Sequence, residues 1–168
     1  PRWQPPPAAP ARDGAARDDR LARTGEALHR VLEWAAAPGQ RQPLEVLLAG
    51  ASQAFGLDAK AREQLEQAAR AILASPECRP FFDAAELLWA GNEVPVGQGS
   101  DDQRIDRLVQ KRDGSWWVLD YKLGATPERE PAYIAQMRGY VAAVQALQPG
   151  EPVHAALISG TGRLVPVG

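Results

Sequence analysis

The spacing of apolar residues changes at Ser75-Pro76, and this change restricts the folds open to the chain. Upstream of this point, apolar residues recur at the helical spacing of three and four positions. Downstream, they form short runs separated by Gly, Asp and Pro, which is typical of strands joined by turns. The sequence therefore predicts a helical first part followed by a sheet, within an α/β domain.

Three helices are predicted in the first part, over residues 20–37, 43–54 and 59–74. Pro38-Gly39 should end the first helix, and Asp58 is a suitable N-terminal cap for the third. Residues 1–19 are rich in Pro and Ala, a composition typical of linkers, and we expect them to be disordered. Because the sequence also lacks an initiating Met, we expect residues 20–168 to form a domain that follows an upstream partner in a longer protein.

The second part should contain a five-stranded sheet and one crossover helix. Three hairpin-like strands come first, and a β-α-β unit with a helix over residues 131–148 follows. The predicted strands cover residues 87–96, 104–110, 116–123, 153–159 and 163–165. Pro166 should close the last strand. The expected architecture is a mixed central sheet with flanking helices and an N-terminal helical lobe.

Composition argues against several classes of protein. Nineteen basic and 21 acidic residues give a formal charge of −2, which neither supports nor excludes a DNA substrate. The single cysteine, Cys78, excludes disulfide frameworks and iron–sulfur clusters and fits a reducing cytoplasm. The sequence has no apolar run that could span a membrane, no Gly-x-x-x-x-Gly-Lys phosphate loop and no Gly-x-Ser-x-Gly nucleophile elbow. Membrane insertion, ATP hydrolysis and ordinary serine hydrolase chemistry are therefore disfavoured.

A carboxylate and an ammonium group are expected on one face of the third strand. Side chains alternate along a strand, so Asp120 and Lys122 share a face and Tyr121 points to the other. A short turn would pair this strand with the preceding one and bring Asp106 close to Asp120. Two converging carboxylates repel each other unless a cation lies between them, and such hard oxygen ligands suit Mg²⁺ or Mn²⁺. The alternative is a plain salt bridge at the end of a strand.

These residues belong to a longer pattern of five motifs in order, from about Thr24 to Tyr140. The motifs are Thr24-Gly25-Glu26-Ala27-Leu28-His29-Arg30-Val31-Leu32-Glu33, Asn92-Glu93-Val94-Pro95-Val96, Arg104-Ile105-Asp106-Arg107, Trp117-Val118-Leu119-Asp120-Tyr121-Lys122-Leu123-Gly124, and Tyr133 with Gln136-Met137-Arg138-Gly139-Tyr140. The pattern resembles the PD-(D/E)XK nuclease domain of the RecB family, which bacterial helicase–nucleases of the RecB and AddA type carry at their C-terminal end. The resemblance implies a restriction-endonuclease-like fold.

The resemblance also implies metal-dependent hydrolysis of DNA phosphodiester bonds. The implied metal ligands are Asp106, Asp120, the backbone carbonyl of Tyr121 and His29. The implied ion is Mg²⁺, for which Mn²⁺ can substitute. His29 has a simpler alternative role as a structural residue of its helix.

Other motif residues would act on water or support the site. Lys122 would orient or deprotonate the attacking water and stabilise developing charge. Glu93 would bind metal-associated water or a second ion, a role for which Glu86 competes.

Three further residues would support the Lys122 region or bind DNA. Gln136 and Tyr140 share a helix face, and the resemblance assigns Arg107 to the same group. As alternatives, Gln136 would make only a helix contact and Tyr140 would be an ordinary core residue.

The predicted function is that of a Mg²⁺-dependent deoxyribonuclease in DNA double-strand-break repair and recombination. The expected enzyme is an exonuclease, with single-strand endonuclease activity left open. We expect single-stranded DNA as the preferred substrate, an upstream helicase domain of the same polypeptide as partner, no membrane partner, and a location in the bacterial cytoplasm. One alternative is a catalytically weak PD-(D/E)XK module that serves as a DNA-binding or docking scaffold. Another is a free-standing nuclease of the CRISPR-associated or phage type. Members of that type that carry an iron–sulfur cluster need several cysteines, and this chain has one.

Overall fold

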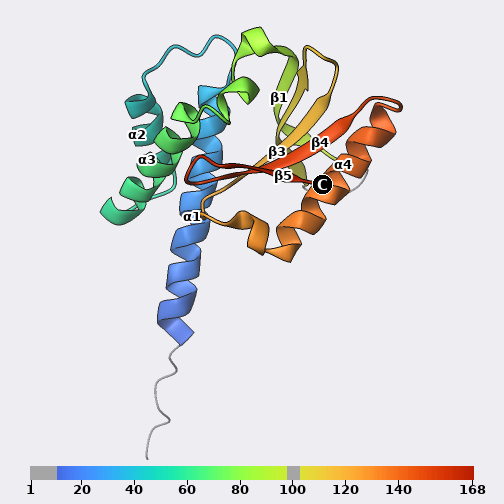
Figure 1. The fold of residues 1–168 in the computed structure, drawn as a ribbon. Coiled ribbons are helices and arrows are strands. Elements are labelled where there is room, and N and C mark those ends of the chain that lie inside the picture. Colours follow the sequence, from blue (N-terminus) through green and yellow to red (C-terminus); the bar gives the residue numbers. More distant parts are fainter. Residues whose placement is uncertain (1–10, 98–102) are drawn as a thin grey trace, which may run out of the picture.

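The predicted order of helices and strands is confirmed. The structure is a computed structural model that describes residues 11–97 and 103–168. Its α-helices are α1 (Ala11–Ala35), α2 (Leu44–Ala54), α3 (Ala59–Ala74) and α4 (Pro131–Leu147). Its strands are β1 (Leu87–Pro95), β2 (Arg104–Lys111), β3 (Trp116–Lys122), β4 (Val153–Ser159) and β5 (Leu164–Val167) (Figure 1). Short 3₁₀ turns lie at η1 (Arg79–Phe81), η2 (Ala84–Glu86) and η3 (Pro127–Arg129).

The start of α1 and the end of β5 differ from the prediction, and several other boundaries shift by one or two residues. Helix α1 begins at Ala11, so residues 11–19 of the expected linker are helical, whereas residues 1–10 lie outside the described residues. The N-terminal proline run ends at Pro10, and the Ala and Arg residues that follow it are good helix formers. Strand β5 continues through Pro166, which pairs with Ala156. Pro166 is tolerated because β5 is an edge strand, where one side of the backbone has no partner strand.

The sheet has the strand order β1-β2-β3-β4-β5. Strands β1, β2 and β3 are antiparallel, β3 and β4 are parallel, and β4 and β5 are antiparallel. Helix α4 is the crossover between β3 and β4, as the sequence predicted. The parallel register places Lys122, at the end of β3, opposite Ser159, at the end of β4.

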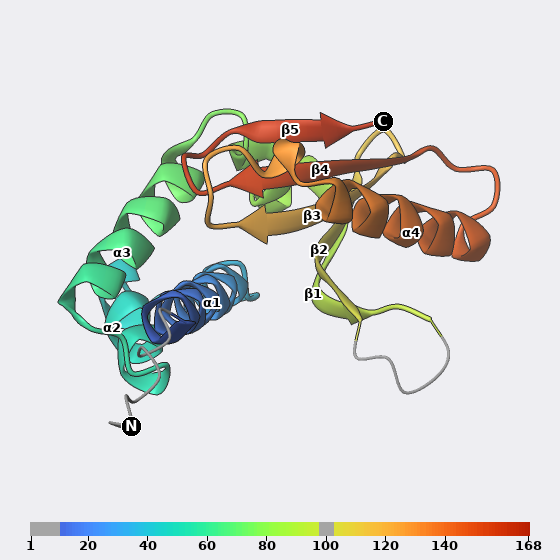
Figure 2. The ribbon, with the colours of Figure 1, turned by 90° about the horizontal axis from the view of Figure 1, so that it is seen from below.

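Each face of the sheet has its own apolar core. On one face, Leu119 and Tyr121 of β3 pack in a core with residues of α1, α2 and α3. On the other face, Val118 packs with Met137 and Tyr140 of α4. Figure 2 shows the helical lobe of α1 to α3 beside one part of the sheet and α4 running along its other face. Within the described residues, no helix is both long and apolar enough to cross a membrane.

Candidate active site

Asp106 and Asp120 lie side by side on the neighbouring strands β2 and β3. Arg107 pairs with Leu119 in the antiparallel register, so the next position along each strand brings the two aspartates opposite each other. Both are buried, with exposed fractions of 7% and 3%. The backbone N–H of Tyr121 donates a 2.9 Å hydrogen bond to Asp106 Oδ2. The predicted approach of the two carboxylates is therefore confirmed.

The environment of Asp106 disfavours its ionised form. Burial is the largest cause that raises its pKa, followed by the negative charge of Asp120 and a hydrogen bond with that side chain. Together these effects raise the pKa of Asp106 to about 9, against the opposing effect of the Tyr121 N–H. Glu93 acts in the same direction as Asp120. Two acids in this arrangement share a proton or bind a cation.

Lys122 projects from the same face of β3 as Asp120, as predicted. Its Nζ lies 2.8 Å from Asp120 Oδ2, and 18% of its side chain is exposed. The contact lacks hydrogen-bond geometry, so the buried Oδ2 atom has no hydrogen-bond partner among the described residues. Lys122 thus balances the charge of Asp120 while Asp120 Oδ2 keeps its acceptor capacity.

Tyr133 is a neighbour of Lys122 that belongs to the last sequence motif but had no role assigned to it. Lys122 Nζ lies 4.0 Å from the centre of the Tyr133 ring, a cation–π contact at the start of α4. The sequence did hold a signal for this contact. Tyr133 precedes Gln136 by three positions on the predicted helix, so it shares the helix face that points toward the site.

His29 reaches the aspartate pair from α1. Its Nε2 lies 2.8 Å from the Tyr121 carbonyl oxygen and 3.5 Å from Asp106 Oδ2. A carbonyl oxygen can only accept, so Nε2 carries the proton in this arrangement. The position predicted for His29 is therefore confirmed, and its role as a ligand, which needs the other tautomer, stays a prediction.

Glu93 lies next to the aspartate pair, and Glu86 does not. Glu93 falls between the pairs Asn92–Arg107 and Val94–Ile105, which places it opposite Asp106. Its backbone has a φ of 50°, the left-handed region that non-glycine residues rarely adopt. Glu86 precedes Leu87, which pairs with Lys111 at the opposite end of β1. The structure therefore favours Glu93 for the predicted role.

The three predicted support residues have different surroundings. Gln136 Nε2 donates a 3.1 Å hydrogen bond to the Tyr140 hydroxyl. Burial, followed by the charges of Asp120 and Asp106, raises the pKa of Tyr140, so this hydroxyl is close enough to sense the acids. Arg107 is buried, and it donates to the Phe81 carbonyl (2.8 Å) and to Asn92 Oδ1 (2.7 Å). Arg107 thus supports the fold around the site, and a role in DNA binding stays a prediction.

A cleft of about 680 Å³ opens beside Lys122 and His29, and we call it the main cleft. Helix α1 lines one side, with Glu26 among its residues, and residues 123–127 line the other. Glu130 and Tyr133, at the start of α4, complete it. A second cleft, the side cleft, is also lined by His29 and includes Glu93 and Arg104. His29 therefore lies where the two clefts meet.

The profile of the PD-(D/E)XK nuclease superfamily matches residues 9–161. The chain belongs to this superfamily. The mixed sheet with flanking helices is consistent with a PD-(D/E)XK restriction-endonuclease-like fold, as expected from the sequence. No curated protein matches the sequence.

Nucleases of the PD-(D/E)XK superfamily typically use divalent metals. In residues 11–97 and 103–168, no group of three or more His, Cys, Asp or Glu side chains has the geometry of a metal site. The chemistry of the donors nevertheless fits a hard cation. Asp120 Oδ2 is buried and has no hydrogen-bond partner in the part of the chain that the structure describes, and Asp106 resists ionisation beside it. His29 Nε2 lies 2.8 Å from the Tyr121 carbonyl oxygen and 3.5 Å from Asp106 Oδ2, so these donors are close together.

Proposed function

We propose that this PD-(D/E)XK protein is a Mg²⁺-dependent deoxyribonuclease of the RecB and AddA type. The observation that carries the proposal is the buried Asp106–Asp120 pair with Lys122 Nζ at 2.8 Å from Asp120. A domain that served only as a scaffold would gain nothing from burying two mutually repelling acids next to a lysine. The biological setting that we propose is double-strand-break repair and recombination in the bacterial cytoplasm.

Asp106, Asp120, the Tyr121 carbonyl and His29 would hold the ion. Bound Mg²⁺ supplies Lewis-acid polarisation of a phosphoryl oxygen and a more acidic water. The Tyr121 N–H fixes the orientation of Asp106 by donating to Oδ2. Two neighbours hold Lys122, the Asp120 carboxylate and the Tyr133 ring, and its ammonium borders the main cleft. From this position Lys122 would orient the attacking water and stabilise charge that develops on the phosphate.

The main cleft gives DNA phosphates little long-range attraction. Among the described residues, Lys122 is the one Lys or Arg that lines it, and Glu26 and Glu130 are acidic. The full sequence carries a formal charge of −2, so counterion release would supply little binding free energy. We infer that an upstream helicase domain delivers a single strand at high effective concentration. The isolated chain should then need a high DNA concentration and prefer single strands to blunt duplex.

The test is cleavage of labelled linear and circular single-stranded DNA by the purified chain. Reactions with Mg²⁺, with Mn²⁺ and with excess EDTA separate metal-dependent cleavage from background. Cleavage of the circle reports endonuclease activity, and an annealed copy of the linear strand reports strand preference. Asp120→Ala is the inactive variant, and Asp19→Ala, at an exposed position on α1, is the matched control.

Cleavage by the parent chain and Asp19→Ala, but not by Asp120→Ala, would support the proposal. Undiminished cleavage in EDTA would contradict the metal dependence. DNA binding without cleavage under every metal condition would instead identify a scaffold module. Tight, salt-resistant binding to duplex with efficient cutting would contradict delivery by a tethered helicase.

A further inference from the structure

The segment that leaves β3 directly after Lys122 forms one side of the main cleft. Residues 123–127 line the cleft, and Glu128 follows in η3. We call residues 123–128 the cleft wall. Helix α4 starts at Pro131, only a few residues later, and carries the Tyr133 ring that contacts Lys122. The path of the cleft wall therefore affects the backbone of Lys122. It also affects the position of the Tyr133 ring, which contacts the Lys122 ammonium.

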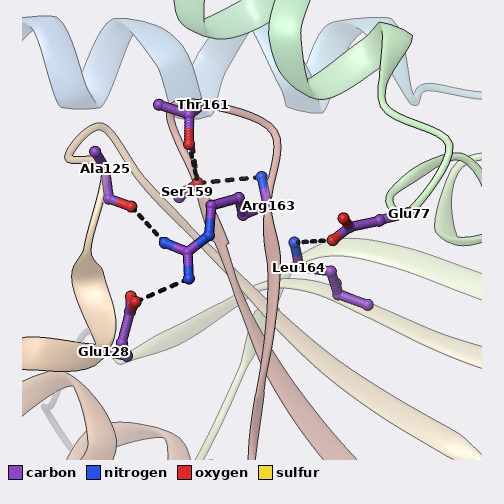
Figure 3. Close-up of polar contacts among 7 residues, drawn as sticks. All are labelled: Glu77, Ala125, Glu128, Ser159, Thr161, Arg163 and Leu164. Carbon is purple, nitrogen blue, oxygen red and sulfur yellow. Dashed lines mark hydrogen bonds and ion pairs between the residues drawn. The ribbon is translucent and has the colours of Figure 1, made fainter.

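Arg163, next to β5, contacts the cleft wall at two points. Its Nη1 donates to the Ala125 carbonyl at 2.8 Å, and its Nη2 donates to Glu128 Oε1 at 2.9 Å. Figure 3 shows the guanidinium between these two partners, with the Arg163 backbone in the turn after β4. A planar fork that donates to a carbonyl and to a carboxylate fixes both the position and the orientation of the segment.

The turn between β4 and β5 also approaches the backbone of the cleft wall closely. The Gly160 N–H donates to the Gly124 carbonyl at 3.1 Å. A Cβ atom at Gly160 would lie 2.0 Å from the Leu123 carbonyl oxygen, so only glycine allows this approach. Ser159 shapes the turn, because its Oγ accepts from the Arg163 backbone N–H at 3.1 Å (Figure 3).

The other side of this turn is attached to the helical lobe. The Ser75 hydroxyl donates to the Gly162 carbonyl at 2.6 Å, and Glu77 accepts from the Leu164 N–H at 2.9 Å. A Cβ at Gly162 would lie 2.5 Å from the Ala71 carbonyl oxygen. The turn is therefore held against the end of α3, and Arg163 extends from this fixed base to the cleft wall.

We propose that Arg163 is a positioning residue for the nuclease reaction. It holds the cleft wall so that Lys122 and Tyr133 keep their places beside the aspartate pair. This inference rests on the proposed nuclease function. Arg163 does not line the main cleft, so it acts through residues 123–128 and not by contact with DNA.

The test compares Arg163→Ala, Arg163→Lys and Glu128→Gln with the parent chain. Arg70→Ala is a matched control, because Arg70 is also half-exposed (46%, against 48% for Arg163) and also donates to two partners, Glu45 and Glu66. Those partners lie on α2 and α3, away from the main cleft. We expect Arg163→Ala to lower kcat on single-stranded DNA about 10-fold to 100-fold, with KM changed less than about twofold. Arg163→Lys should recover only part of kcat, since lysine keeps the charge but not the fork.

A second measurement does not depend on activity. Amide hydrogen exchange in peptides that cover residues 123–130 should become faster in Arg163→Ala and in Glu128→Gln, and should stay unchanged in Arg70→Ala. An unchanged kcat in Arg163→Ala, or unchanged exchange in this segment, would overturn the inference. An effect on KM alone would overturn it too, because it would identify Arg163 as a DNA contact. If the parent chain cleaves no DNA, the proposed function fails, and the exchange result still decides whether Arg163 holds the cleft wall.

Discussion

Replacing Asp106 by asparagine should stabilise the metal-free chain at neutral pH while removing its activity. The pKa of Asp106 is about 9 in the folded chain, because of burial and the charge of Asp120, and is about 3.9 in an unfolded chain. The folded chain therefore binds the proton more tightly than the unfolded chain. The free energy of unfolding must then fall as pH rises between these two pKa values. Asparagine does not titrate, so the Asp106→Asn variant escapes this loss.

The size of the effect follows from the width of the pH interval. Each pH unit within it changes the free energy of unfolding by at most about 1.4 kcal/mol per proton. From about pH 4 to pH 7 the ceiling is therefore about 4 kcal/mol, and we expect a gain of about 1–4 kcal/mol at pH 7. The gain in the free energy of unfolding should be near zero at about pH 4, where Asp106 is neutral in the folded chain. Asparagine Oδ1 can still accept the Tyr121 N–H, so the substitution leaves this donor satisfied.

Urea unfolding in EDTA at several pH values measures this difference. The control is Asp58→Asn, because the Ala61 backbone N–H, as the largest cause, lowers the pKa of the exposed Asp58. Because its pKa is lowered on folding, Asp58 changes the free energy of unfolding with pH in the opposite direction. The ionised Asp58 stabilises the folded chain above the unfolded-state pKa, and this stabilisation is lost as pH falls. Added Mg²⁺ should stabilise the parent chain and not Asp106→Asn. An Asp106→Asn variant whose stability advantage does not grow with pH would refute the reasoning.

Three further substitutions test individual side chains. Lys122→Ala should slow cleavage about 10²-fold to 10⁴-fold while calorimetry still detects Mn²⁺ binding, and near-normal turnover would contradict a catalytic role. His29→Ala should weaken Mn²⁺ affinity about 10-fold to 100-fold without unfolding the chain, since buried Leu28 and Val31 hold this part of α1. Unchanged affinity would leave His29 a structural residue. Tyr121→Phe should leave the free energy of unfolding in urea unchanged or raise it by up to about 1–3 kcal/mol. The reason is that the buried Tyr121 hydroxyl has no hydrogen-bond partner among the described residues. A clear loss of stability would show that this hydroxyl is bound.

Elements whose signals are local were predictable from the sequence. Helix α3 spans Ala59–Ala74 as expected, and Asp58 caps it by accepting from the Ala61 N–H at 2.8 Å. Strand β4 spans Val153–Ser159, also as expected. The pairing of β2 with β3 followed from the short turn between them, where Gly114 has a φ of 89°. In each case the capping, alternating or turn residues lie within the element or next to it.

Details that the sequence did not indicate depended on contacts between distant parts of the chain. Pro166 stops a central strand but not β5, and only the strand order identifies β5 as an edge. Arg107 follows Asp106 in the motif, and the resemblance assigned it to DNA binding or support of the site without indicating which groups hold it. In the folded chain, the Phe81 carbonyl and Asn92 accept its hydrogen bonds, and the Phe82 ring lies 5.1 Å from its guanidinium carbon. No periodicity near Arg107 could have indicated these partners.

The candidate active site likewise combines residues that local sequence signals predict with residues that only contacts between distant segments bring together. Alternation along β3 places Asp120 and Lys122 together, and a hairpin adds Asp106, so the acidic pair and the lysine come from local geometry. A precise position for the lysine ammonium needs more than this, because its side chain has four rotatable bonds and a single carboxylate contact. The Tyr133 ring supplies the second contact, and the parallel pairing of β3 with β4 brings the turn that carries Arg163 beside the segment between Lys122 and Tyr133. A motif can therefore identify the reacting groups, whereas the residues that hold them in place emerge only from the topology.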